Sequence, residues 1–380
     1  MDPTVRLLRQ LVAIDSVNPS LVAGAKGEAD IARALIDELR GIGLETHLQE
    51  VAPGRPNVIG VLEGRAHGRS MMFCGHTDTV GVAGMARPFD PVERDGRVYG
   101  RGSQDMKSGV AAMIGAARVI AESGGLAAGR LVIACVVDEE HASIGAEALV
   151  TRWRADAGVV TEPTELAVAV AHKGFEWVEI ETEGRAAHGS RPRDGRDAIL
   201  RMGRVLGELE ALDRQLQAGR AHPLVGSASL HASLIEGGRE LSSYPDRCAL
   251  QIERRTIPGE ADGIAGREVA RILETIQARD PEFTAASNTM FARAPYEIPP
   301  DHELPTAVVT AAAEAGTNSP TIGMSFWTDA AILGGAGIPS VLFGPTGTGL
   351  HGLEEWVEIQ SVLTCRDALV NLARAWCSRT

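Results

Sequence analysis

The spacing of hydrophobic and polar positions changes several times along the chain. Apolar residues recur at helical spacing across residues 3–15 and 27–42, which predicts two amphipathic helices. The second helix ends at a Gly-rich break, after which "LETHLQEV" alternates as a strand does. Further apolar strands are predicted at 57–63, 70–75 and 130–137, with a helix of small residues at 107–123 between the last two. Strands that alternate with helices in this way predict an α/β layer.

Near Lys173 the spacing changes to one of half-exposed strands. "GFEWVEIETEG", "SASLHASLIEG" and "DRCALQIERR" each alternate apolar and polar residues. Long charged helices are predicted at 194–217 and 261–278, and a last strand at 284–292. The resulting β-α-β-β-α-β order is that of a ferredoxin-like α+β module.

After residue 293 the Pro-rich "RAPYEIPPDHELP" indicates a return linker. Helix and strand patterns then resume with "PTAVVTAAAEAG", "IPSVLFGP" and a helix at 358–377. The α/β domain is therefore expected in two parts, residues 1–173 and 293–380, with residues 174–292 inserted between them.

The amino-acid composition limits the kinds of partner and the location that we expect for the protein. The 37 basic and 50 acidic residues give a formal net charge of −13, which argues against a nucleic-acid or anionic-membrane partner. The N-terminus lacks the apolar region of a signal peptide, and no apolar run is long enough to span a bilayer. The cysteines are scattered singly, which predicts buried reduced thiols and a cytoplasmic location; they are Cys74, Cys135, Cys248, Cys365 and Cys377.

Candidate metal ligands follow several of the predicted strands. Open α/β sheets build their sites at the carboxyl ends of strands. Side chains that can bind a metal or orient a ligand occur in "GHTDTV", "GRGSQDMKSG", "VVDEEHA", "VVTEPTE" and "GTGLHG"; they are His76, Asp78, Asp105, Glu139, Glu140, Glu162 and His351.

The three consecutive acids at 138–140 stand at the end of a predicted buried strand, where like charges repel. A solvated strand end would explain them, and a helix cap or a loop histidine would explain the other candidates one at a time. Together, two imidazoles and three carboxylates are better explained by zinc or a similar first-row dication. Five ligands suffice for two ions if one carboxylate bridges them.

These motifs resemble the dinuclear zinc amidohydrolases and exopeptidases that include acetylornithine deacetylase, succinyl-diaminopimelate desuccinylase, carboxypeptidase G and the aminoacylases. The resemblance runs from "LVAIDSVNPS" to "FGPTGTGLHGLEEWV" and so covers nearly the whole chain. It implies a zinc-exopeptidase-like α/β catalytic domain with the inserted module as a lid and dimerisation domain. It also implies two Zn²⁺ ions, for which Co²⁺ or Mn²⁺ could substitute, and a homodimer.

The resemblance also implies a role for each candidate. Asp105 would bridge the two ions, with His76 and Glu162 on one and Glu140 and His351 on the other. Glu139 would be the general base toward the attacking water, and Asp78 would orient His76. Asp138 has no role that the motifs explain.

Two positions of the expected lid are candidates through the same resemblance. His188 in "RAAHGSRP" matches a histidine that reaches the partner subunit's site and steadies the oxyanion. Arg254 or Arg255 in "QIERRTIPGE" would pair with a substrate carboxylate, since a guanidinium fork fits that group. Only one of two neighbours on a strand faces a given side, and Arg255 is favoured.

Two departures from relatives concern the substrate. Ser242 and Ser243 occupy a segment where many relatives carry an Asn, and Asp329 stands where some deacetylases carry a Glu. The expected activity is hydrolysis of the amide bond of a small N-acyl amino acid, as in acetylornithine deacetylase. The alternatives are a dipeptidase or carboxypeptidase acting on a short peptide, and a non-catalytic metal-binding scaffold.

Two other classes of enzyme are disfavoured by motifs that the chain lacks. No GxGxxG opens a helix after the first strand, which argues against a nucleotide-binding oxidoreductase. No GxSxG elbow occurs, which argues against a serine hydrolase.

Overall fold

The computed structural model describes residues 1–379, and the chain folds into two compact units. The first unit comprises residues 1–170, 298–322 and 328–380, and the second comprises 171–297 and 323–327. The second unit therefore extends a few residues beyond the expected insertion at 174–292 and also takes a short segment from the C-terminal part. The sequence of the second unit is thus inserted into that of the first.

The first unit is built on a mixed sheet whose strands follow the order β1-β2-β6-β3-β7-β17-β8. The neighbouring strands β6, β3, β7 and β17 run parallel to one another. β2 pairs antiparallel with β1 on one side and with β6 on the other. The apolar runs of β3 and β6 are buried almost throughout, as expected for strands covered on both faces. The strands are β1 Glu45–Ala52, β2 Arg55–Glu63, β3 Ser70–His76, β6 Arg130–Val136, β7 Ala157–Val160, β8 Val168–His172, β16 Thr321–Met324 and β17 Ser340–Leu342.

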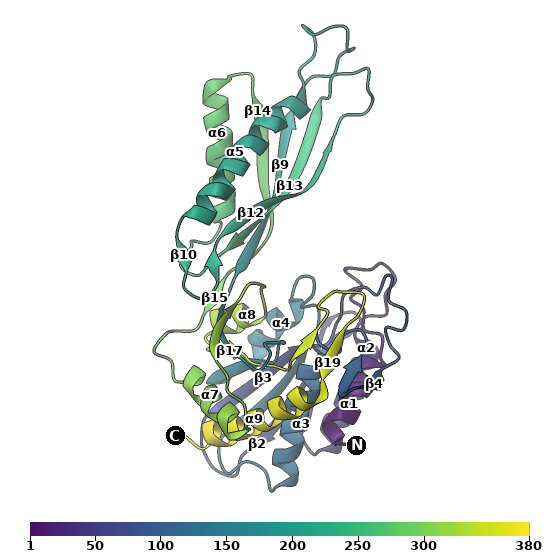
Figure 1. The fold of residues 1–380 in the computed structure, drawn as a ribbon, viewed down its shortest axis with the longest axis vertical. Helices are drawn as coiled ribbons and strands as arrows, with labels where there is room; N and C mark the ends of the chain where they lie inside the picture. The colour runs from purple at the N-terminus through teal and green to yellow at the C-terminus, as the bar shows by residue number, and fades with distance from the viewer. Residues whose placement is uncertain (380) are drawn as a thin grey trace. The chain divides into compact units, whose positions relative to one another are not determined.

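Helices cover this sheet on both sides. α3 packs against α1 and α9 and, with α9, against β3, whereas α4 and α8 contact each other and lie on the opposite side of the sheet from α9 (Figure 1). α1 begins where the Asp2 carboxylate accepts the Thr4 amide at 2.7 Å and Pro3 opens the first turn. The helices are α1 Pro3–Val12, α2 Ala29–Gly41, α3 Lys107–Glu122, α4 Ile144–Arg152, α7 Leu304–Glu314, α8 Ala330–Gly335 and α9 Ile359–Cys377.

A second, small antiparallel sheet of the first unit follows the order β18-β19-β5-β4. Its pairing places Tyr99 opposite Trp356 and Val98 opposite Val357. These strands are too short to show a period in the sequence and were not among the predicted elements. They are β4 Val92–Arg94, β5 Arg97–Tyr99, β18 Gly347–Thr348 and β19 Trp356–Glu358.

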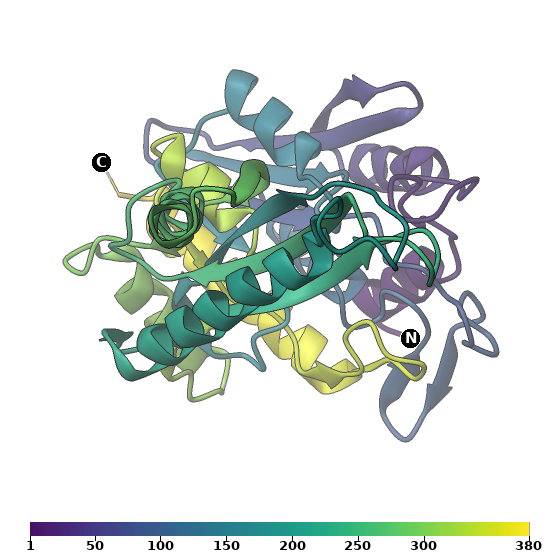
Figure 2. The ribbon, with the colours of Figure 1, turned by 90° about the horizontal axis from the view of Figure 1, so that it is seen from above.

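The second unit has the β-α-β-β-α-β order that the sequence predicts, with an antiparallel sheet in the order β12-β13-β9-β14. α5 and α6 pack on one face of this sheet and form an apolar core with it; Figure 2 shows α5 lying along the strands. On the other face, the outward positions of β9 are Phe175 and Trp177, followed by Glu179, Glu181 and Glu183. The elements are β9 Gly174–Glu183, α5 Ala198–Ala218, β10 Ala221–His222, β11 Gly226–Ser227, β12 Ser229–Gly237, β13 Arg247–Thr256, α6 Ile264–Arg279, β14 Thr284–Arg293 and β15 Tyr296–Glu297.

The expected α/β domain with an inserted ferredoxin-like module is thus confirmed. The five cysteines are free and buried, as predicted. Within residues 1–379, every helix is too short or too polar to cross a bilayer.

Candidate metal centre

Parallel strands bring the first group of candidate ligands together. His76 is the last residue of β3 and lies opposite Val136, the last residue of β6. Glu139 and Glu140 follow β6, and Glu162 follows β7, which also pairs with β3 in parallel. Because the carboxyl ends of these strands meet at one edge of the sheet, the side chains that follow them converge.

His76 is at the centre of this first group. Its ring is 1% exposed, and its Nε2 lies 3.1 Å from Asp105 Oδ1, 3.8 Å from Glu162 Oε1 and 4.0 Å from Glu139 Oε2. Asp105 comes from the loop before α3, and its peptide bond to Met106 is cis. Three carboxylates therefore face one imidazole nitrogen.

His351 forms a second group with the same aspartate. Its Nε2 lies 3.1 Å from Glu140 Oε2 and 3.4 Å from Asp105 Oδ2. Asp105 thus directs Oδ1 to His76 and Oδ2 to His351. The His351 side chain is 56% exposed, so this second group is the more open of the two.

Burial is the largest influence on the pKa values of the acids in the centre. It raises the pKa of Glu139 and Glu162 well above the ordinary value, and neighbouring carboxylates add to the shift. Burial and then the charge of Asp105 raise the pKa of Glu140 to about 7. Without a nearby cation, simultaneous ionisation of these carboxylates is therefore unfavourable.

The pKa values of the two histidines are also raised, but by neighbouring carboxylates rather than by burial. Burial opposes protonation of His76, but the hydrogen bond with Asp105 and the charges of Glu162 and Glu139 outweigh it and hold the pKa well above the usual range. Hydrogen bonds with Asp105 and Glu140 raise the pKa of His351 to about 10. Both imidazoles sit where a positive charge is favoured.

A pair of divalent cations fits these residues. Ligand atoms lie within 4.8 Å of one another in two sets, His76 with Glu139 and Glu162, and His76 with Asp105 and Glu140. Within the described residues, the buried Oε1 of Glu140 has no hydrogen-bond partner, which is unusual for a carboxylate oxygen. Imidazole and carboxylate together are the donors that first-row dications prefer.

Asp78 supports the centre through its backbone oxygen and through its carboxylate. Its backbone oxygen lies 3.0 Å from His76 Nδ1, nearer than its carboxylate Oδ1 at 3.6 Å. The carboxylate instead accepts the amides of Glu139 at 3.1 Å and Glu140 at 3.2 Å, together with the Asn18 side chain at 2.8 Å. Asp78 therefore holds the backbone of both glutamates as well as facing the His76 ring.

Asp138, for which the motifs suggest no role, belongs to a buried network beside Asp78. Its Oδ1 accepts the Asn18 amide at 3.0 Å and lies 2.8 Å from the Arg55 guanidinium. Arg55 also makes two hydrogen bonds with Glu28, which is fully buried. Arg55 therefore offsets the charge of Asp138, the first of the three consecutive acids. Asp138 has a φ of 69° and fixes the turn in which it lies. Asn18, Arg55 and Glu28 were not among the predicted site residues, although Asn18 lies in the "LVAIDSVNPS" segment.

The two lid candidates lie in the second unit and have contacts of their own there. The His188 side chain is exposed, with Nδ1 2.8 Å from the Ser190 hydroxyl, and the His188 backbone pairs in an isolated antiparallel β-bridge with that of Ser243, one of the two departures from relatives. Arg255 is half-buried, paired with Glu253 at 2.6 Å and stacked 5.4 Å over the Phe175 ring.

Arg254, the alternative to Arg255, is fully buried. Its guanidinium bonds the carboxylates of Glu260 and Glu268 at 2.7 and 3.1 Å. Arg255 is therefore the neighbour with access to a ligand.

Asp329, the other departure, is buried at the start of α8 in the first unit. Its charge contributes to the raised pKa of Glu139 and Glu162, after burial and nearer charges. It therefore belongs to the electrostatic surroundings of the centre.

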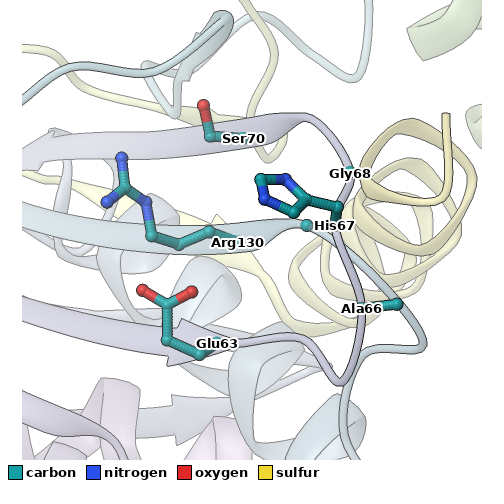
Figure 3. A pocket seen from close by; sticks show the side chains of 7 residues that line it. Glu63, Ala66, His67, Gly68, Ser70 and Arg130 are labelled. Carbon is teal, nitrogen blue, oxygen red and sulfur yellow. The ribbon is translucent and has the colours of Figure 1, made fainter. Parts of the chain in front are cut away.

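A different hollow of about 380 Å³ lies at the opposite ends of the same strands (Figure 3). Glu63 lies across from Arg130, which pairs with Ser70 at the start of β3, and His67 lies in the loop before it. Its side chains are exposed or half-exposed, and no set of metal ligands gathers there among the described residues. The chemistry therefore belongs to the carboxyl ends of the strands.

Comparison with known proteins agrees with this geometry. The family model described as peptidase family M20/M25/M40 matches residues 72–375. The chain is 30% identical to an acetylornithine deacetylase of Myxococcus xanthus, over 97% of this chain and 96% of that protein. It is 25% identical to the N-formyl-4-amino-5-aminomethyl-2-methylpyrimidine deformylase of Bacillus subtilis, over 99% and 95%.

A solved structure shares the fold. A dinuclear metal binding peptidase from the M20 family of Bacillus subtilis superimposes with a TM-score of 0.75 at 18% identity, covering 99% of this chain and 98% of that one. The matched family model spans most of the chain, and both sets of candidate ligands include His76, at the carboxyl end of β3. The chain belongs to the peptidase family M20/M25/M40 and is an enzyme of this family of dinuclear metal hydrolases.

Proposed function

We propose that the protein hydrolyses the amide bond of a small N-acyl amino acid, in the manner of an acetylornithine deacetylase. The observation that carries the metal-dependent chemistry is Asp105, which directs one carboxylate oxygen to each of two histidines. The choice of an N-acyl amino acid is supported by the similarity to an acetylornithine deacetylase along almost the entire length of both chains.

The residues divide into two ligand sets around a shared carboxylate. Asp105 would contribute to both sets, His76 and Glu162 would complete one, and Glu140 and His351 would complete the other. Zinc suits these donors best, with cobalt or manganese as substitutes. When bound, the two ions would lower the pKa of water toward neutrality and polarise the substrate carbonyl.

Glu139 is the proposed general base. Its carboxylate faces the first set, and it shares its backbone support with Glu140 through Asp78. It accepts the proton of the attacking water and returns it to the leaving amine, so that one side chain serves both halves of the reaction. Asp78 keeps His76 and this glutamate in place.

The second unit is proposed to serve as lid and dimerisation domain. Arg255 would bind the substrate carboxylate, and His188, from the partner subunit, would stabilise the oxyanion. Support for a homodimer comes from β12, which is an edge strand with Leu234 and Ile235 exposed. Five free buried thiols also favour a reducing compartment such as the cytoplasm.

A dipeptidase or carboxypeptidase remains the second candidate, because a peptidase of the family shares the whole fold. The deciding experiment loads the purified protein with zinc or cobalt and measures release of amine. The substrates are N-acetyl, N-succinyl and N-formyl amino acids in parallel with dipeptides.

We expect hydrolysis of one class of N-acyl amino acid well above that of any dipeptide, and its loss after chelation. Faster cleavage of dipeptides would replace the deacylase proposal by the peptidase one. Two bound ions without hydrolysis of any of these substrates would overturn both the deacylase and the dipeptidase proposals.

A further inference from the structure

Another buried carboxylate, that of Glu355, contacts the loop that carries Asp105. Its side chain is 0% exposed and cannot reach bulk water. Oε1 accepts the backbone amides of Gln104 at 2.8 Å and Asp105 at 3.0 Å, and Oε2 accepts that of Gly102 at 3.0 Å. Three amides of one loop therefore converge on a single carboxylate, which stabilises the loop as a bound anion would.

Arg101 completes the arrangement and extends it to the loop that carries His351. Its guanidinium lies 2.7 Å from Glu355 Oε2 and also donates to the Gly352 carbonyl at 2.8 Å. The Glu355 carbonyl accepts the Gly100 amide at 3.0 Å, next to the pairing of β5 with β19. Backbone and side chains thus join two segments that are about 250 residues apart in the sequence.

The two halves of the metal centre depend on this junction unequally. His76 and Glu162 are fixed by the ends of central parallel strands. His351 has no strand to hold it, has a φ of 57°, and is half-exposed. Its distance to Asp105 is therefore set by the contacts between the two loops.

We propose that Glu355 is a positioning residue that fixes Asp105 relative to His351 and so determines whether the second metal ion binds tightly. The inference rests on the proposed dinuclear function. It assigns the ion held by Glu140 and His351 to the loop junction, and the ion held by His76 and Glu162 to the sheet. Loss of the Glu355 carboxylate should selectively weaken binding of the ion at Glu140 and His351, which is the second metal ion.

The test compares Glu355→Gln with Glu354→Gln, which makes the same chemical change at the exposed neighbour. In Glu355→Gln an amide NH₂ must face either the Gly102 amide and Arg101 or the amides of Gln104 and Asp105, so donors oppose donors. Metal-free proteins are first compared by hydrogen exchange of the 100–106 segment. Each is then titrated with Co²⁺, whose absorption reports both the number and the surroundings of bound ions, and with Zn²⁺ followed by metal analysis.

We expect wild type and Glu354→Gln to bind two ions. Glu355→Gln should retain one tight ion, bind the second about 10- to 100-fold more weakly, and exchange the 100–106 amides faster. Two ions bound by Glu355→Gln with wild-type affinity and spectrum would overturn the proposal, as would equal weakening of both ions.

Failure of the proposed function has a different signature, namely a wild type that binds no metal. The hydrogen-exchange comparison then still decides whether Glu355 orders the loop. If Glu355→Gln does not fold, Arg101→Lys takes its place, since it keeps the charge but cannot reach both Glu355 and Gly352. It should weaken the second ion in the same direction, and wild-type binding by Arg101→Lys would contradict the proposal.

Discussion

Arg254 in the second unit is fully buried and bonded to the carboxylates of two glutamates, whereas the centre in the first unit gathers four buried or half-buried carboxylates around two imidazoles. In the second unit the cation that offsets the negative charge is part of the chain. In the first unit, even two protonated histidines would leave an excess of negative charge. The larger surplus of carboxylates in the first unit therefore suits external cations, whereas the carboxylates around Arg254 have a cation of the chain itself.

The largest expected effect is on catalysis. Glu139→Gln should lower turnover of the N-acyl substrate by about 10²- to 10⁴-fold, because the water loses its proton acceptor. The variant should remain folded and keep two ions, measured by metal analysis of the purified protein. Glu140→Gln is the matched variant and should lose metal. If both variants lost metal equally, the division between base and ligand would be wrong.

The next effect concerns the cluster in the second unit. Arg254→Met should lower the free energy of unfolding by about 3–5 kcal/mol, because it leaves Glu260 and Glu268 without their cation. Urea denaturation measures this loss. Metal content at low denaturant should not change. A variant as stable as wild type would show that the cluster is not needed for folding.

A smaller effect follows from the acids of the metal-free centre. Burial raises the pKa of Glu140 from an ordinary 4.5 to about 7 in the folded chain. The folded state then holds a proton that the unfolded state releases, so stability is lost as the pH rises through this range. With chelator present, the midpoint of thermal unfolding should be a few kelvin lower at pH 8 than at pH 5.

Metal should remove much of that dependence, because the ions offset the ionised carboxylates. Thermal scans with and without zinc across the same pH range test this directly. The same slope in both series would contradict a metal centre built on these acids.

The smallest effect is expected at an exposed ion pair on the open face of the second unit's sheet. Arg247 bonds Glu181 across β13 and β9, but both side chains are in contact with water. Water and salt screen such pairs, so Arg247→Met should leave the denaturation midpoint unchanged within error. A loss comparable to that of Arg254→Met would show that burial does not distinguish the two arginines.

Much of the fold could be predicted because long elements carry their own period. The predicted helix at 358–377 is α9, Ile359–Cys377, and the predicted strand at 130–137 is β6, Arg130–Val136. Strands of two or three residues, such as β5 and β19, show no such period and were missed. Their pairing is decided by partners far away in the sequence.

The same distinction between local pattern and distant pairing applies to the residues of the candidate site. The sequence by itself determined which side chains could bind metal, because His76, Glu139, Glu140 and Glu162 follow apolar strands whose ends must meet at one edge of a parallel sheet. Only the tertiary structure decided how these acids are held: Arg55 neutralises Asp138, Asp78 supports two amides, and Glu355 anchors the Asp105 loop. The physical reason is that local periodicity records which face of an element is buried, whereas a buried charge is satisfied by whichever distant group the fold brings within hydrogen-bonding distance.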